Sequence, residues 1–375
     1  PLILTEGTNG VAHSAAIPGT TPLRVSAGID SASDGCAAFS AGAFAGAIAV
    51  VRRGGCSFAI KTNSAAAAGA IAVVIANNAD GGLTPSVPGT TIPAFSVTLA
   101  DGDALRDFAA GRADVTAGIG FPAQGLPNTP DALAAFSSRG PAGDFDLLKP
   151  DVTAPGVSIL AAVAGPTLTG FEQDVGLLNG TSMASPHHAG AAALVRQARP
   201  GWTVAEVKSA LAMTAERNVL LEDQVTPADP FARGSGRLRV DKAINAGLVL
   251  DETAANYLAA DPVAGGDPGA LNQPSLARRS CFPVCEFERT FRNPTGRAGL
   301  WRVQVSGVPG FAIPGALHIP AGATRTVKIK LFAWALPTDG SCNFGDVALT
   351  PLGHGPHHGG GALHLPLAVA GQPPA

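Results

Sequence analysis

Four consecutive residues, Asn179-Gly180-Thr181-Ser182, precede an apolar, alanine-rich stretch and are the segment of the chain best suited to chemistry. A serine hydroxyl is a weak nucleophile at neutral pH; it needs a general base and donors for the developing oxyanion. A helix N-terminus supplies part of this, because its amide hydrogens are free and its dipole end is positive. The segment therefore predicts a nucleophile loop: Ser182 attacks, Gly180 permits a close turn, and the Ser182 amide and Thr181 hydroxyl face the oxyanion.

The residues around this loop make the prediction specific. Gly-Thr-Ser alone is common, and on its own it would indicate an ordinary helix cap. The uninterrupted run of residues 179–186, followed by His187, resembles the nucleophile segment of the subtilisin-like serine peptidases, or subtilases. Three other segments resemble subtilase segments in the same order, namely residues 136–141, 148–157 and 234–243. The resemblance implies a serine endopeptidase that cleaves protein or peptide substrates through an acyl-enzyme at Ser182.

The catalytic set that this resemblance implies is incomplete in the sequence. In subtilases the triad Asp stands at a strand end before Gly, the triad His opens a His-Gly-Thr block, and an oxyanion Asn follows; none of these blocks is present. His13 lacks such a context, and His187 and His188 follow Ser182 too closely on the helix that it opens. A triad acts as a unit, so we expect the chain alone to be inactive. The other half of the catalytic domain is expected upstream or on a separate chain.

Residues 1–125 are predicted to form one domain. Residues 46–51 and 70–75 are apolar runs bounded by polar and glycine residues, as in buried strands. Between them, residues 58–68 have a helical composition that stops at Gly69. Strand, helix and strand at this spacing indicate a βαβ unit.

Part of this domain resembles a known module. Residues 53–58, Lys61 and residues 72–78 resemble a protease-associated domain. Such domains are inserted in many extracellular peptidases, are thought to hold or screen substrates, and carry no catalytic residues. Within such a domain a crosslink between Cys36 and Cys56 is favoured over a redox role.

Two more elements and a linker complete the domain. Residues 92–97 are a strand candidate, and residues 101–110 predict a short helix that begins at an acidic cap, Asp101. The Pro- and Gly-rich residues 121–130 mark a boundary. We assign residues 126–250 to the C-terminal part of a subtilisin-like catalytic domain.

Two helices are predicted within residues 126–250. Residues 184–197 are apolar and alanine-rich, which predicts a buried helix after the serine loop. Thr203 and Glu206 form a capping-box pattern at the start of a second helix. The residues expected on the buried face of this helix are Val204, Val207 and Leu211, with Ala210 and Thr214 beside them. Asp151 lies outside the family's triad, so we expect it in a capping or turn role.

The last part of the chain alternates polar and apolar residues. Residues 287–293, 301–305 and 324–331 show this period of two between Gly and Pro turns, which predicts half-buried antiparallel strands. Residues 265–375 resemble the fibronectin-III-like domain that ends many subtilases. The predicted architecture is a partial α/β subtilase core, a parallel sheet with helices, together with an α+β protease-associated domain and a C-terminal antiparallel β-sandwich.

Charge and hydropathy limit the classes of partner. The formal net charge is −3 and the sequence has no long run of Lys or Arg, which argues against nucleic acid and acidic membranes. The most apolar stretch, residues 65–76, is much shorter than the roughly 20 residues of a membrane-spanning helix. We expect protein or peptide substrates, and the other half of the catalytic domain, as partners.

The cysteines and histidines favour disulfides over a metal site. The five cysteines have no zinc-site spacing, and disulfides indicate an oxidising compartment, so we expect a secreted protein. The connectivity of the last three, Cys281, Cys285 and Cys342, stays open. The C-terminal histidines His354, His357, His358 and His364 are expected to be a surface tract with adventitious metal binding at most. No cofactor is evident; subtilases commonly bind calcium, but the sequence has no Asp-rich ligand loop.

Two hypotheses from different classes follow. In the first, the chain is the C-terminal portion of an active serine endopeptidase. In the second, it is a non-catalytic extracellular fragment that binds proteins through its protease-associated and β-sandwich domains. The codons upstream of Pro1 separate the two, because only the peptidase needs an Asp block and a His-Gly-Thr block there.

Overall fold

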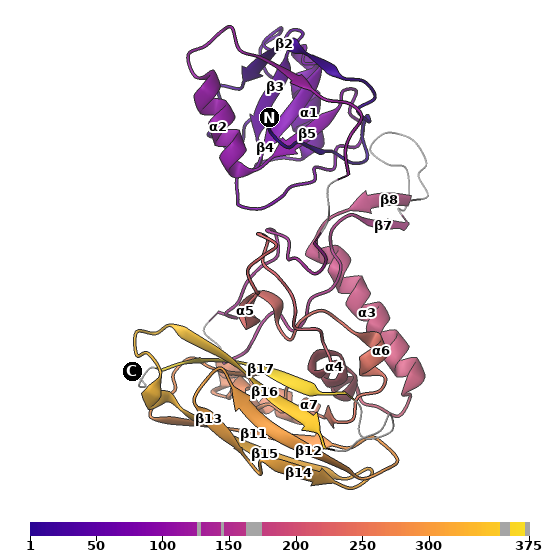
Figure 1. Cartoon of the computed structure of the whole chain (residues 1–375), viewed down its shortest axis with the longest axis vertical. Helices are drawn as coiled ribbons and strands as arrows, with labels where there is room; N and C mark the ends of the chain where they lie inside the picture. Colours follow the sequence, from indigo (N-terminus) through magenta and orange to yellow (C-terminus); the bar gives the residue numbers. More distant parts are fainter. Residues whose placement is uncertain (126–128, 144–145, 163–174, 353–360, 372–375) are drawn as a thin grey trace. The chain divides into compact units, whose positions relative to one another are not determined.

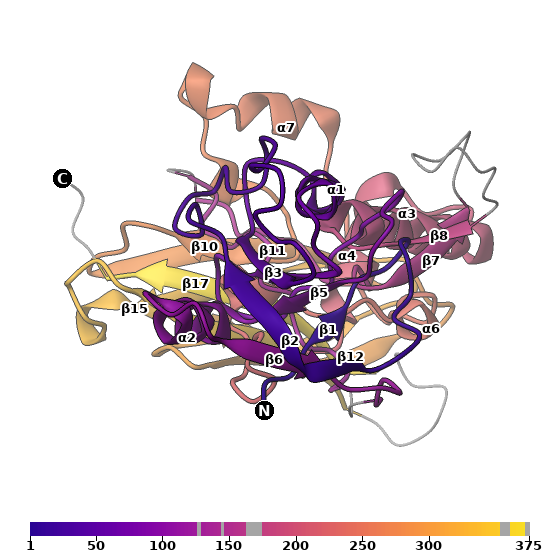
Figure 2. The same cartoon turned by 90° about the horizontal axis from the view of Figure 1, so that it is seen from above.

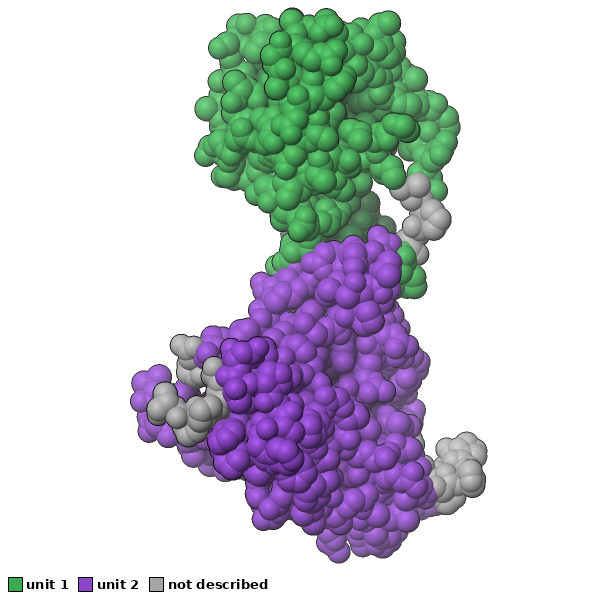
Figure 3. All heavy atoms as spheres, turned by 60° about the vertical axis from the view of Figure 1, so that its left-hand side comes forward, with its two compact units in different colours: residues 1–130, 134–136, 156–183 green, residues 131–133, 137–155, 184–375 purple. Residues whose placement is uncertain are grey.

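The structure is a computed structural model, and it describes residues 1–125, 129–143, 146–162, 175–352 and 361–371. The chain divides into two compact units, which Figure 3 shows in different colours. Unit 1 comprises residues 1–130, 134–136 and 156–183, and unit 2 comprises residues 131–133, 137–155 and 184–375. Each unit is made of three separate segments of the chain, so no single cut in the sequence separates the two units.

Unit 1 is built on a sheet that has six strands in the described residues (Figure 1). In sheet order these are β1 (Thr5–Glu6), β5 (Ala94–Val97), β4 (Ala72–Ala76), β3 (Ile48–Arg52), β2 (Ile17–Val25) and β6 (Thr116–Ile119). The four inner strands pair in parallel, and the two edge strands are antiparallel to their neighbours. The predicted βαβ unit is confirmed as β3, α1 (Phe58–Ala67) and β4.

Two helices cover opposite faces of this sheet (Figure 1). Every residue of β3 and β4 is buried, and successive side chains of a strand point to opposite faces, so both faces need an apolar cover. Ala49 packs in one cluster with Ala65 of α1. Val50 packs in another cluster, against which Leu105 of α2 (Leu99–Ala109) lies.

The helix boundaries in unit 1 confirm one prediction and correct another. The chain leaves α1 through Gly69 with φ +95°, a conformation that favours glycine, as predicted. The cap of α2 is Thr98 and not Asp101: the Thr98 hydroxyl accepts the Asp101 amide at 3.1 Å. Thr98 directly follows β5 and still has the extended backbone that an N-cap needs, whereas Asp101 lies in the first helical turn.

The described cysteines form two disulfides. Cys36 and Cys56 are crosslinked within unit 1, as expected, with their Cα atoms 5.6 Å apart. In unit 2 Cys281 pairs with Cys285, and Cys342 is a free thiol.

Unit 2 contains two packed sheets and a set of short helices (Figure 1). Within the described residues the first sheet is β10 (Leu276–Arg278), β17 (Leu363–Ala370), β16 (Cys342–Pro351), β12 (Gly299–Ser306) and β14 (Ala316–Ile319). The second is β13 (Gly310–Ile313), β15 (Thr324–Phe332), β11 (Val284–Arg292) and β9 (Val249–Leu250). The antiparallel strands predicted from period-two alternation are confirmed as β11, β12 and β15.

The described helices of unit 2 are most of α3 (Thr181–Ala198), from Ala184 on, and four shorter ones: α4 (Val204–Met213), α5 (Pro230–Arg233), α6 (Val240–Ala243) and α7 (Ala254–Ala259). Three 3-10 turns lie at Pro262–Ala264, Pro268–Ala270 and Ala333–Ala335. Helix α7 has no buried residue and lies at the periphery of the unit (Figure 2). No helix among the described residues combines the length and hydropathy needed to cross a membrane.

Helix α4 has the predicted capping box. The Thr203 hydroxyl accepts the Glu206 amide, and the Glu206 carboxylate accepts the Thr203 amide. The residues predicted on its buried face are buried, with one exception: Val204 is 72% exposed. Val204 is the first helical residue, so its side chain lies beyond the part of α4 that packs on the core.

Helix α3 (Thr181–Ala198) confirms the predicted helix but not its burial. Among its described side chains only Ala191 and Val195 are buried, and Leu194 is 54% exposed. The buried pair packs in the core cluster of unit 2, whereas the described residues leave the other faces of the helix uncovered.

His364 was expected in a surface tract and is instead buried. It lies in β17, every residue of which is buried between β10 and β16. One ring nitrogen faces the Ala215 carbonyl at 3.2 Å and the other faces the Asp346 carboxylate at 3.3 Å. His354, His357 and His358 lie outside the described residues.

Candidate active site

The predicted nucleophile loop is a strand–turn–helix connection. Strand β8 (Val175–Leu178) pairs antiparallel with β7 (Ile159–Ala162) and leads into Asn179 and Gly180. Helix α3 begins at the next residue, Thr181 (Figure 1). This arrangement places Ser182 in the first turn of the helix, as the sequence predicted.

Hydrogen bonds to the segment before β7 and to Thr84 hold the turn. The Gly180 amide donates to the Gly156 carbonyl at 2.8 Å. The Asn179 side chain accepts the Ser158 amide and donates to the Thr84 carbonyl at 3.4 Å. Ser158 has φ +52°, a conformation that costs roughly 1 kcal/mol for a residue with a Cβ. The Asn179 carboxamide helps to offset this cost, so Asn179 is a positioning residue for the turn.

A second asparagine, which the sequence analysis did not single out, holds β8 itself. The Asn9 side chain donates to the Leu177 carbonyl at 2.6 Å and accepts the Leu177 amide at 3.3 Å. It therefore bonds the backbone of β8 as a neighbouring strand would. The sequence signal was limited to the turn dipeptide Asn9-Gly10, which does not identify a partner 168 residues away.

Ser182 has the exposure and the local field that a nucleophile needs. Its side chain is exposed, and its amide belongs to the first turn of α3, where amides have no acceptor within the helix. A negative charge that develops beside this turn is stabilised by the free amides and the dipole. Among the described residues, neither a histidine nor a carboxylate hydrogen-bonds the Ser182 hydroxyl, so no general base is in place.

The histidines of α3 cannot act as that base. His187 and His188 follow Ser182 by five and six residues, which corresponds to about 7.5 and 9 Å along the helix axis. At about 3.6 residues per turn, both side chains also leave the helix on other faces than Ser182. His13 is also committed elsewhere: one ring nitrogen lies 3.2 Å from the Gly120 carbonyl, and the ring packs edge-on against Phe95.

Asp151 has a different role from the capping or turn role that we expected. Its carboxylate pairs with Lys149 at 2.5 Å and with Lys208 at 3.0 Å. Burial acts to raise the pKa of this carboxyl, but the two lysine ammonium groups outweigh it and the pKa lies below its usual range. Burial also lowers the pKa of the nearby His188, which favours the neutral ring.

The described residues provide no obvious place for a metal ion. No three His, Cys, Asp or Glu side chains in this part of the chain come together as ligands.

Residues 16–243, more than half of the chain, match the model of the subtilase family of peptidases. The chain belongs to the subtilase family. Among curated subtilases, the minor extracellular protease Vpr of Bacillus subtilis is 37% identical over 236 residues, which cover 62% of this chain and 28% of that protein. Subtilisin-like protease SBT1.6 of Arabidopsis thaliana is 36% identical over 230 residues, covering 57% of this chain and 30% of that protein. The chain therefore spans less than a third of the length of these relatives.

Solved structures add little to this assignment. A zinc aminopeptidase from Bacillus subtilis aligns with 31% of this chain and 26% of its own, at 23% identity and a TM-score of 0.24. So low a score supports no inference about the fold or the site of this subtilase.

Proposed function

We propose that this subtilase chain is the C-terminal part of a secreted serine endopeptidase, with Ser182 as the nucleophile that forms an acyl-enzyme with protein or peptide substrates. The observation that carries the proposal is the exposed Ser182 in the first turn of α3, within a segment that matches the family. Asn179 and Gly180 hold the turn, while the Ser182 amide and the Thr181 hydroxyl serve the oxyanion.

The triad Asp and His, in this proposal, come from polypeptide outside the 375 residues. Two apolar surfaces support it. Helix α3 is largely uncovered in the described residues, and the β7–β8 pair exposes Leu160, Val175 and Leu178. A two-stranded pair with exposed apolar side chains is marginally stable alone, so further polypeptide of the catalytic domain is the natural cover for it.

The flanking regions would serve the substrate in this enzyme. We assign residues 1–125 to a protease-associated domain and residues 265–375 to a fibronectin-III-like domain. The parallel sheet of unit 1, with its turn after β3, and the two packed sheets of unit 2 support these assignments. In this proposal neither region contributes a catalytic residue.

A fluorophosphonate probe tests the role of Ser182, because it labels serines that a base has activated. The gene product that includes the upstream coding sequence should be labelled at Ser182, and Ser182→Ala should abolish the label. Ser185→Ala is the matched control, since Ser185 is an exposed serine three residues along the same helix and should leave labelling intact. The 375-residue chain alone should react about 10⁴-fold more slowly or worse, because its triad is incomplete.

Two results would contradict the proposal. Rapid stoichiometric labelling of Ser182 in the 375-residue chain would show that the base lies within it. A folded longer product that the probe does not label at Ser182 would favour the non-catalytic, protein-binding alternative.

A further inference from the structure

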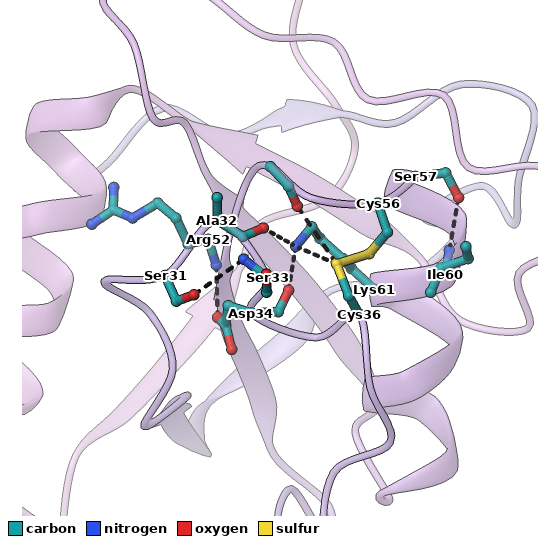
Figure 4. Close-up of a disulfide and its surroundings, with 11 residues drawn as sticks. Ser31, Ala32, Ser33, Asp34, Cys36, Arg52, Cys56, Ser57, Ile60 and Lys61 are labelled. Carbon is teal, nitrogen blue, oxygen red and sulfur yellow. Dashed lines mark hydrogen bonds between the residues drawn. A yellow bond between two sulfur atoms is a disulfide. The ribbon is translucent and has the colours of Figure 1, made fainter.

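A fully buried lysine lies beside the disulfide of unit 1 (Figure 4). Lys61, on helix α1, is 0% exposed. Lysine is almost never fully buried unless its ammonium group is paired, because desolvating the charge is costly. The peptidase chemistry proposed for Ser182 does not use this residue, so its position calls for a separate explanation.

The Lys61 ammonium group has three acceptors, one for each of its hydrogens. It donates to the carbonyls of Asp34 and, at 3.3 Å, of Ala32, and it lies 3.5 Å from Sγ of Cys36. Only the charged form of lysine offers three donors, so the site matches the ammonium ion. Figure 4 shows the side chain directed between the two carbonyls and the sulfur.

In the described part of the chain, the carboxylate that acts on Lys61 electrostatically, that of Asp34, is bound to other donors. The Asp34 carboxylate accepts the Ser26 hydroxyl at 2.5 Å and the Arg52 amide at 2.9 Å. Burial lowers the pKa of Lys61, and the Asp34 charge opposes that lowering. The three acceptors fit the ammonium form, and one of its hydrogens is directed at sulfur.

The two sulfurs of the disulfide are therefore in unequal fields. The Lys61 ammonium group places a full positive charge 3.5 Å from Cys36 Sγ. Its other polar neighbour, the Gly54 carbonyl at 3.6 Å, carries only a partial negative charge. Cys56 immediately precedes Ser57, the N-cap of α1, and feels at most the roughly half charge of a helix end. A thiolate is therefore better stabilised on Cys36 than on Cys56.

We propose that the Cys36–Cys56 disulfide is a thiol-exchange site with a fixed direction, in which an external thiol attacks Cys56 and Cys36 leaves. The attacking thiolate forms a bond to Cys56 Sγ while the bond between the two cysteine sulfurs breaks. The electron pair of that bond stays on Cys36, whose thiolate pairs with the Lys61 ammonium group. A second thiolate then attacks the external sulfur and releases Cys56, so the protein gains two electrons and the thiols form a disulfide.

Access and preorganisation both support this direction. Cys36 and Cys56 are half-buried, and Gly55 and Ser57, on either side of Cys56, are exposed. Gly55 has φ +76°, and a Cβ there would lie 3.1 Å from Cys36 Sγ and 2.5 Å from the Ala32 carbonyl oxygen. Glycine therefore lets the loop pack closely against Cys36 and the Ala32 backbone. Gly35 packs against the Lys61 stem, where a Cβ would lie 3.4 Å from the lysine Cβ.

The first experiment determines which sulfur is attacked. The 375-residue chain carrying Cys342→Ser, which removes the free thiol, is treated briefly with limiting glutathione and quenched with acid. Peptide mapping by mass spectrometry should find the mixed disulfide on Cys56. Glutathione on Cys36, or on both cysteines equally, would overturn the proposal.

The second experiment measures each thiol separately. In the same background, Cys56→Ser leaves Cys36 alone and Cys36→Ser leaves Cys56 alone. We expect iodoacetamide to alkylate Cys36 about tenfold faster than Cys56 at pH 7, because a larger share of Cys36 is thiolate. Equal rates, or a faster Cys56, would contradict the proposal.

A third variant tests the lysine itself. Lys61→Met in the Cys56→Ser background should abolish the rate advantage of Cys36, and Lys61→Arg should retain part of it. A Cys36 that stays equally fast in a folded Lys61→Met variant would refute the role of the ammonium group. If that variant does not fold, the mapping and the two single-thiol rates still decide the direction of exchange. None of these measurements depends on peptidase activity.

Discussion

Asp151 shows how far a side chain's role depends on charges that are distant in sequence. Lys149 is two residues away, but Lys208 belongs to α4 and reaches the same carboxylate at 3.0 Å. We expect Asp151→Asn to cost about 1 kcal/mol of unfolding free energy at pH 7, because the lysines lose their counter-charge while the shape is kept. Chemical denaturation of the variant and the parent chain measures this difference.

The pH dependence of that difference follows from the lowered pKa of Asp151. A carboxylate whose pKa is lower in the folded state stabilises the protein above its unfolded value, about 3.9, and this stabilisation is lost as the pH falls through the folded value. The two unfolding curves should therefore converge under strongly acidic conditions. Asp241→Asn is the control, because that carboxylate pairs with Arg239 at an exposed site. Its loss should change the free energy of unfolding only slightly. An Asp151 effect that persists unchanged at low pH would rule out the ion pairs as its cause.

At the scale of elements, Glu206 joins helix α4 to the sandwich. One carboxylate oxygen accepts the Thr203 amide in the capping box, and the other accepts Nε of Arg292 on β11. Glu206 is only 2% exposed. We expect Glu206→Ala to cost about 2–3 kcal/mol, since it opens the cap and leaves the Arg292 guanidinium without its partner. Thr203→Ala, which removes only the cap hydroxyl, should cost about 1 kcal/mol. Equal losses in urea denaturation would show that the Arg292 contact contributes nothing.

The elements that could be predicted from sequence are those specified by local pattern. Strand β3, helix α1 and the capping box of α4 follow from apolar runs, Gly69 and the Thr203–Glu206 spacing. The helix that follows the serine loop was predictable for the same reason, whereas strand β8 before the loop was not predicted. The exposure of α3 and the burial of His364 could not be predicted, because each depends on which distant elements cover the residue. The Asn9 contact to β8 and the Lys61 contact to Cys36 likewise join residues that no local pattern connects.

At the scale of the molecule, the main core cluster of unit 2 joins its helices to its sandwich. The same cluster contains Val195 of α3, Leu211 of α4 and the fully buried Trp301 of β12. Strand β9 pairs with β11, so the residues that follow the helices complete a sheet of the sandwich. We expect the helical and sandwich parts of unit 2 to unfold together. Hydrogen exchange of the full chain in low denaturant should give the core amides of α4 and β11 the same opening free energy. Clearly different values would show two independently stable parts.

The division of the chain also separates its chromophores. Trp202, Trp301, Trp334 and the single tyrosine, Tyr257, all belong to unit 2. Intrinsic tryptophan fluorescence therefore reports on unit 2 alone, and a sample in which unit 1 is unfolded or cleaved can give an intact emission spectrum. Phe95, buried in β5, is a site where a tryptophan would make unit 1 visible to the same measurement.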